Sequence, residues 1–171
     1  MKTLEYKNAS PWYQATCATL RRAVPSGLLA GCLSAATAAA ASTDASGSAF
    51  APINAVTHCL WPQRALRERD FSIRHTVTGF TIHQAAAIFW AVMFEALVDR
   101  MAGPAPSRRP GATAAAAAAT VASAYVVDYK VVPDRLTPGF EAHLSRRSLG
   151  NVYVALGAGL LAAALLRRPD R

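Results

Sequence analysis

The sequence predicts an all-α fold embedded in a membrane: an antiparallel four-helix bundle with a short interfacial helix in its first loop. The charged fraction of 16% is well below the roughly 25% typical of soluble domains, and the mean hydropathy is +0.19. The 18 Lys and Arg and the 10 Asp and Glu lie almost entirely outside four long segments, residues 24–42, 76–98, 111–127 and 149–166.

These four segments contain a single formal charge, Glu95. A soluble amphipathic helix would carry charge on its outer face at nearly every turn, and none of these segments has such a face. Residues 76–98 also exceed the roughly 20 apolar residues that cross a hydrocarbon core about 30 Å thick. We therefore expect four membrane spans and name the lipid bilayer as the first partner of the chain.

The chain length of 171 residues is that of about one domain. We expect a polar N-terminal tail or interfacial helix over residues 1–23, a four-span membrane domain over 24–166, and a basic tail over 167–171. The net charge of +8 does not indicate a nucleic-acid partner, because the basic residues are spread evenly over the flanks of the spans. No basic stripe with interleaved aromatic residues and no groove-reading motif is present.

The N-terminal part leaves two alternatives open. Trp12 and Tyr13 favour a short interfacial helix, but a loose tail also fits residues 1–23. Arg21-Arg22 before an apolar segment resembles a secretory signal, and residues 29–32 resemble a lipoprotein cleavage box. The leader is long, however, and the apolar segment continues past Cys32. A retained first span is therefore favoured over a cleaved signal.

Small residues four apart in the first and last spans predict close helix packing. The predicted packing positions are Gly27, Gly31, Ala35, Ala155, Gly159 and Ala163. The second and third spans are joined by a short Pro-rich turn over residues 101–110, and a connection this short favours antiparallel neighbours.

The first loop predicts a short helix between Pro52 and Pro62, because proline suits a first helical turn and interrupts a helix interior. Its apolar residues suit a helix on the bilayer surface or dipping into it. The three cysteines, Cys17, Cys32 and Cys59, have no metal-binding spacing and predict no disulfide framework.

His83 lies in the second span, about 12 Å deeper than His75 at a rise of about 1.5 Å per residue. We expect it to face the bundle interior as a neutral ring, bonded to a hydroxyl of another helix. The candidate partners are Ser34, Thr37, Thr120 and Ser123. The alternative is a proton or ligand site open to the loop face. Glu95, near the other end, is expected to pair with a base or reach headgroup water.

The third loop, DYKVVPDRLTPGFEAHLS over residues 128–145, together with the four-span plan, resembles small uncharacterised inner-membrane proteins of Gram-negative bacteria. The resemblance covers the second to fourth spans and implies an inner-membrane location. No established activity accompanies that family, so the resemblance implies no site residues.

A four-span topology puts the first and third loops on one side, where several potential ligands gather. The candidate metal-binding residues are His58, His75, His83, Asp128, Glu141 and His143. No two histidines have the four-residue spacing of a helical metal site, and His75 and His83 are too far apart along one helix to bind one haem axially. We expect no cofactor.

The sequence contains no nucleophile elbow, phosphate loop or Cys pair. The favoured function is that of a non-catalytic structural, accessory or interaction protein of the inner membrane. The alternatives are a metal- or haem-binding protein that uses His83 with loop histidines, and a small oligomeric transporter. Ten of the 18 Lys and Arg lie on the side of the termini, which favours cytoplasmic termini. A homo-oligomer or another membrane protein is the expected protein partner.

Overall fold

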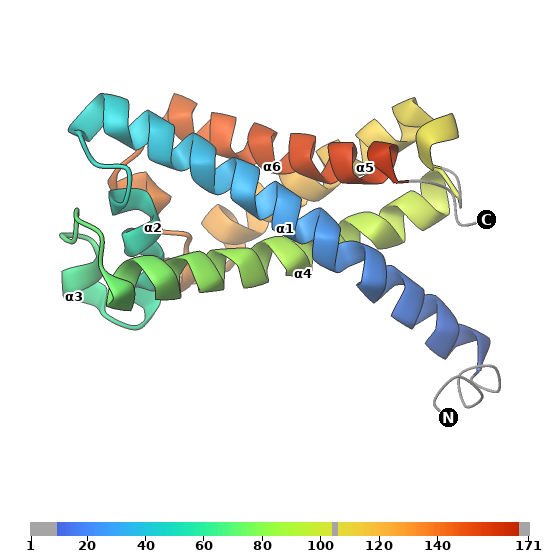
Figure 1. Cartoon of the computed structure of the whole chain (residues 1–171), viewed down its shortest axis with the longest axis horizontal. Helices are drawn as coiled ribbons and strands as arrows, with labels where there is room; N and C mark the ends of the chain where they lie inside the picture. Colours follow the sequence, from blue (N-terminus) through green and yellow to red (C-terminus); the bar gives the residue numbers. More distant parts are fainter. Residues whose placement is uncertain (1–9, 104–105, 168–171) are drawn as a thin grey trace.

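The computed structural model describes residues 10–103 and 106–167, and this part of the chain contains helices and no β-strand. Four long helices form a bundle (Figure 1), which confirms the all-α prediction. They are α1 (Pro11–Ser46), α4 (Thr78–Met101), α5 (Pro110–Val126) and α6 (Arg146–Leu166). The short helices are α2 (Ala51–Ala55), η2 (Val56–Cys59), α3 (Pro62–Ala65), η3 (Ile73–Val77), η4 (Pro106–Arg108), η5 (Val127–Val131), η6 (Asp134–Leu136) and η7 (Phe140–Ala142).

Helix α1 is longer than the sequence predicted. It continues without a break from Pro11 to Ser46, so the expected interfacial helix and the expected first span are one element. Its 36 residues measure about 54 Å at about 1.5 Å each, more than a hydrocarbon core of about 30 Å. Its N-terminal end projects away from the bundle (Figure 1). The helix ends at Gly47, whose φ of 76° is readily adopted by glycine.

Glycines let α1 approach both of its main neighbours, α4 and α6. A Cβ atom on Gly27 would lie 2.5 Å from the Cα of Ile88 in α4. A Cβ atom on Gly159 in α6 would lie 2.5 Å from the Cα of Ala30. Gly31 leaves room instead for the side chain of Gln84. The backbones can approach this closely because these positions carry no side chain.

The other three predicted packing residues do not make such close backbone contacts. Ala35 packs against the hydrophobic cluster at the loop end of the bundle. Ala155 and Ala163 are half-buried in α6. The second stripe therefore makes its closest backbone approach at Gly159.

The short helix predicted in the first loop is present as α2 and η2, but it is not a surface helix. Every residue from Ala51 to His58 is buried. Its backbone fits against α4 because Gly79 has no side chain, and a Cβ there would lie 2.0 Å from the carbonyl oxygen of Ile53. We call residues 51–59 the cap, because they close the loop end of the bundle.

The buried amide of Asn54 joins the cap to the rest of the first loop. It donates to the carbonyl oxygens of Glu68 (3.1 Å) and Asp70 (2.9 Å) and accepts from the hydroxyl of Thr76 (2.7 Å). A fully bonded buried amide contributes specificity, because any other loop path would leave its polar atoms unpaired. The cap is thereby held in one position over the bundle.

Candidate functional site

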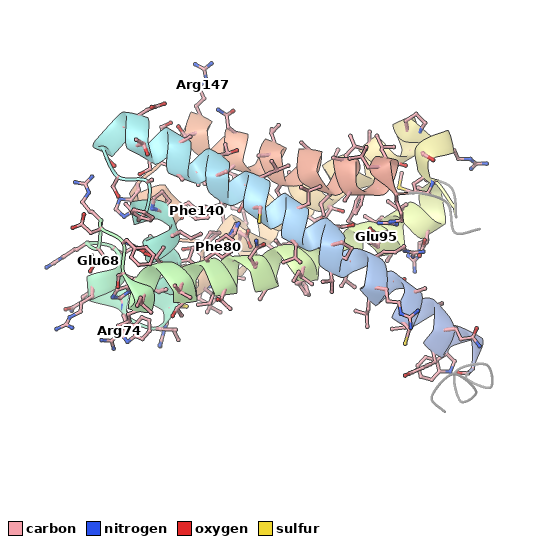
Figure 2. The ribbon with its side chains drawn as sticks, in the orientation of Figure 1. Glu68, Arg74, Phe80, Glu95, Phe140 and Arg147 are labelled. Carbon is pink, nitrogen blue, oxygen red and sulfur yellow. The ribbon has the colours of Figure 1, made fainter. Side chains whose placement is uncertain are left out.

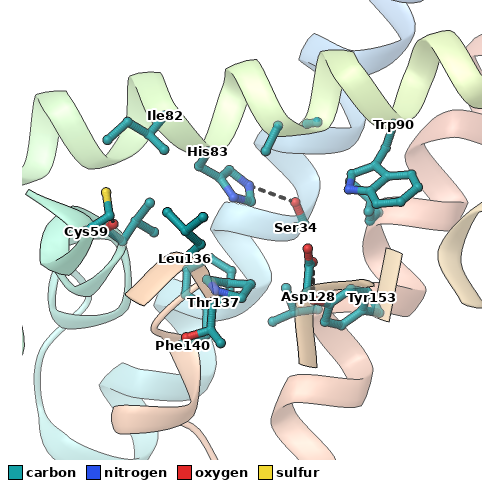
Figure 3. A pocket seen from close by; sticks show the side chains of 16 residues that line it. Ser34, Cys59, Ile82, His83, Trp90, Asp128, Leu136, Thr137, Phe140 and Tyr153 are labelled. Atoms are coloured by element: carbon teal, nitrogen blue, oxygen red, sulfur yellow. Dashed lines mark hydrogen bonds between the residues drawn. The ribbon is translucent and has the colours of Figure 1, made fainter. Parts of the chain in front are cut away.

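A cavity of about 190 Å³ lies at the loop end of the bundle, between α1, α4, α6, the cap and the third loop (Figure 3). Its apolar walls come from Val56, Ile82, Leu136, Phe140, Val152 and Leu156. Its polar lining comes from Ser34, His83, Trp90, Asp128, Thr137 and Tyr153. The cavity reaches the outer surface, because Ala86 and Leu136 line it and are also exposed.

His83 contacts α1, one of the two helices that the sequence offered as its partner. Its Nε2 lies 3.0 Å from the hydroxyl of Ser34 and 3.1 Å from the carbonyl oxygen of Gly31. A carbonyl oxygen can only accept, so this contact assigns the proton of the neutral ring to Nε2. The other ring nitrogen, Nδ1, is then an acceptor that has no partner among the described residues.

Asp128 is the acidic group of the cavity. Its carboxylate accepts a hydrogen bond of 2.6 Å from the hydroxyl of Tyr153, and Figure 3 shows it directed into the space between α1, α4 and α6. No described Lys, Arg or His forms an ion pair with it. The second carboxylate oxygen therefore remains available as an acceptor.

Aromatic rings line the same region. Trp90 presents its ring to the cavity, with the indole nitrogen on the side that faces His83 (Figure 3). Tyr153 lies edge-on to Tyr125 at 5.5 Å between ring centroids and to Tyr129 at 6.2 Å. The Tyr129 hydroxyl donates to Glu141 at 3.1 Å. Glu141 thus lies just behind the wall that carries Asp128.

Two other candidate histidines belong to the cap region and not to the cavity lining. His58 is buried, with Nδ1 2.9 Å from the carbonyl oxygen of Ala55 and Nε2 3.1 Å from that of Asp134. His75 is buried with Nδ1 2.9 Å from the hydroxyl of Thr57. Both rings connect loop segments through hydrogen bonds that a metal would have to replace.

His143 is half-buried in the third loop, away from the cavity lining. Burial lowers its pKa, and the nearby Arg69 guanidinium lowers it further, against a hydrogen bond with the backbone of Leu66. Of the six predicted ligand candidates, the structure brings His83 and Asp128 to one cavity with Glu141 behind it. Within residues 10–103 and 106–167, no three His, Cys, Asp or Glu side chains could together hold a metal ion.

A second polar cluster, at the other end of the bundle, surrounds Glu95 (Figure 2). This carboxylate is completely buried and accepts from Ser26 of α1 at 2.7 Å. The Arg167 guanidinium, just after α6, donates to both carboxylate oxygens, and Nε of Arg22 lies 3.4 Å away. Glu95 does pair with a base, which was one of its two predicted environments. We call these four residues the Glu95 cluster.

The roles of Tyr153 and of the partners of Glu95 were not predicted from the sequence. A tyrosine inside a span is a signal, because a buried hydroxyl normally finds a hydrogen-bond partner, but that signal does not identify Asp128. Ser26, Arg22 and Arg167 each look like ordinary span-end residues in the sequence. Only the packing of α1 against both α4 and α6 brings them to one carboxylate.

Four helices of the described chain are long and apolar enough to cross a membrane: Trp12–Ser46, Ile73–Met101, Pro110–Val131 and Arg146–Leu166. They suggest a membrane protein with several spans. No known protein family, curated protein or solved structure matches the chain. The cavity and the Glu95 cluster are therefore interpreted from their own chemistry.

Proposed function

We propose that the chain is a four-span inner-membrane protein with antiparallel spans and cytoplasmic termini, and that it acts without catalysis by binding a small molecule in the loop-end cavity. Its resemblance to small four-span inner-membrane proteins of Gram-negative bacteria supports the location. The excess of Lys and Arg on the side of the termini supports the orientation. The observation that carries the binding role is the cavity itself.

Exposed apolar side chains support the membrane location. Leu28, Leu29, Phe89, Met93 and Val154 are between 38% and 69% exposed on the three helices α1, α4 and α6. Apolar surface on several long helices is costly in water and is satisfied by lipid. Reporter fusions after residues 69, 107, 135 and 171 should alternate between the two sides of the membrane, and a detergent-free soluble monomer would refute this location.

The cavity geometry supports binding and argues against hydrolysis. Ser34 and His83 lie within hydrogen-bond distance, as a nucleophile and its base would. However, Nε2 also faces the carbonyl oxygen of Gly31, so it carries a proton and cannot accept one from Ser34. The Ser34 hydroxyl itself donates to the same carbonyl at 3.1 Å. The pair therefore stabilises the contact between α1 and α4.

The volume of the cavity limits the size of the ligand that it can hold. An apolar cavity of about 150 Å³ in another protein binds benzene, and this cavity measures about 190 Å³. It is smaller than the roughly 300 Å³ or more of sites for drug-sized molecules. A single substituted ring is the largest rigid group that the present shape can enclose.

The test uses three single-ring probes, toluene, benzyl alcohol and benzylammonium, with the purified chain in detergent micelles. At least one probe should raise the unfolding temperature in a saturable way, because a ligand that binds only the folded state stabilises it. Ala86→Phe should abolish this effect by filling the mouth of the cavity. The matched control is Ala85→Phe, an exposed neighbour outside the lining, which corrects for partitioning of the probe into micelles. Equal responses in both variants, or no response to any probe, would refute the binding role.

A further inference from the structure

Two carboxylates, one in the cavity lining and one behind it, have no basic partner among the described residues. Asp128 lines the cavity, and Glu141 accepts hydrogen bonds from Thr137 (2.7 Å) and Tyr129 (3.1 Å). Neither forms an ion pair with a described residue. The chain has 18 Lys and Arg against 10 Asp and Glu, so the lack of a partner does not reflect a shortage of bases.

Nearby bases make other contacts. The Arg135 guanidinium donates to the carbonyl oxygen of Cys59 at 3.1 Å, and the Arg74 guanidinium lies over the Trp61 ring, 4.5 Å from its centroid. An unpaired carboxylate in an apolar cavity is unfavourable, because desolvation of the charge is not offset by an opposite charge. A positively charged ligand would supply that charge.

We propose that the cavity binds a small organic monocation, consisting of one ring and an ammonium group that is held by Asp128. This inference rests on the binding role proposed above and identifies its ligand class. The ammonium would donate to the carboxylate oxygen that Tyr153 leaves free. His83 lines the same cavity, and its Nδ1 has no hydrogen-bond partner among the described residues.

The walls fit the rest of such a ligand. Trp90 and Tyr153 present aromatic rings to the cavity, and aromatic faces attract organic cations. Phe140 and Ile82 provide apolar surface for the ring of the ligand. An anion is disfavoured, because it would lie beside Asp128, and the described lining of the cavity contains no Lys or Arg to bind it.

A metal cation fits less well than an organic one. A hard cation needs about six oxygen ligands, and the described chain has no group of three His, Cys, Asp or Glu side chains that could hold a metal. One carboxylate with aromatic walls matches the composition of a site for an ammonium with an apolar body. The charge of the ligand is therefore the feature to test.

The experiment compares benzylammonium with benzyl alcohol, which has the same ring and a neutral hydroxyl of similar size. The protein carries Trp12→Phe and Trp61→Phe, so that Trp90 is the remaining indole and its fluorescence reports occupancy. Benzylammonium should bind at least about tenfold more tightly than benzyl alcohol near neutral pH, because a charge-assisted hydrogen bond is stronger than a neutral one. Titration calorimetry on the unmodified chain should give the same ratio.

Asp128→Asn should remove the preference for benzylammonium while benzyl alcohol still binds, and that retained binding shows that the variant is folded. Asp134→Asn, an exposed carboxylate of the same loop, is the matched control and should keep the preference. Equal binding of the two probes by the unmodified chain, or a preference that survives in Asp128→Asn, would overturn the cation inference and leave the binding role intact. Failure of toluene, benzyl alcohol and benzylammonium alike would overturn both.

Discussion

The Glu95 cluster offers the sharpest test of how the bundle is held together. Glu95 is completely buried in α4 and interacts with Ser26, Arg22 and Arg167, which lie on or next to α1 and α6. Glu95→Gln keeps the size of the side chain and one acceptor oxygen but removes the charge. Two guanidinium groups would then face each other without their shared carboxylate.

The magnitude follows from the burial of the cluster. Removing one partner of a buried ion pair typically costs about 3 to 5 kcal/mol. The Arg22 and Arg167 side chains are 28% and 26% exposed, so water or headgroups can solvate part of the charge that is left. We expect Glu95→Gln to lower the free energy of unfolding by about 2 to 4 kcal/mol. For a chain of this size that is a fall in Tm of about 5 to 15 °C.

Thermal and denaturant unfolding in detergent measure this loss. Asp99→Asn is the matched control, because Asp99 also pairs with Arg22 but its side chain is 40% exposed, and exposed pairs contribute about 1 kcal/mol or less. Glu95→Gln combined with Arg167→Gln should recover part of the loss, since fewer charges are then uncompensated. A Glu95→Gln variant as stable as the original chain would refute the structural role of the cluster.

Three further predictions concern other contacts. Gly159→Ala should destabilise the bundle by about 1 to 3 kcal/mol, because the new Cβ meets the backbone of α1. Gly150→Ala is the control and should leave stability unchanged, because a Cβ there faces open space. Chemical unfolding measures the free energy of unfolding of both variants. His83→Leu should cost about 0.6 to 2 kcal/mol through loss of the bond to Ser34, and an unchanged Tm would contradict that contact. Because folding lowers the pKa of His143, its contribution to stability is present above the unfolded pKa of about 6.5 and is lost as pH falls below it. His143→Gln should therefore reduce the loss of stability that occurs as pH falls below about 6.5, measured in a pH series of Tm values.

Local composition was enough to predict the helices and one contact between them. Charge exclusion identified the four long apolar helices, since it depends only on which residues each helix contains. The position of His83 on its helix predicted that it faces the bundle interior, and Ser34 was among its four candidate partners. Both inferences depend on the residues of a single helix, and neither requires knowledge of how the loops fold.

Features that depend on how the loops pack could not be predicted in the same way. The apolar pattern of the cap fits a surface helix as well as a buried one, and its burial follows from Gly79 and from the bonds of Asn54 to Glu68 and Asp70. The predicted clustering of loop histidines assumed only a shared side of the bundle. In the structure, His58 bonds to backbone carbonyls, and no helical period indicates such a partner.

The two acidic sites of the bundle show how the same chemical group can serve two purposes. Arg22 and Arg167 satisfy Glu95 from within the chain, so a ligand there would have to displace an existing base. Among the described residues, the carboxylate of Asp128 has the hydroxyl of Tyr153 as its only hydrogen-bond partner, and its cavity reaches the surface at Ala86. Glu95 already has its counter-charge and stabilises the fold. Asp128 lacks a counter-charge among the described residues and can gain one only from outside them. The end of the bundle that holds the Glu95 cluster is therefore the structural one, and the loop end, whose cavity reaches the surface, is the one suited to binding.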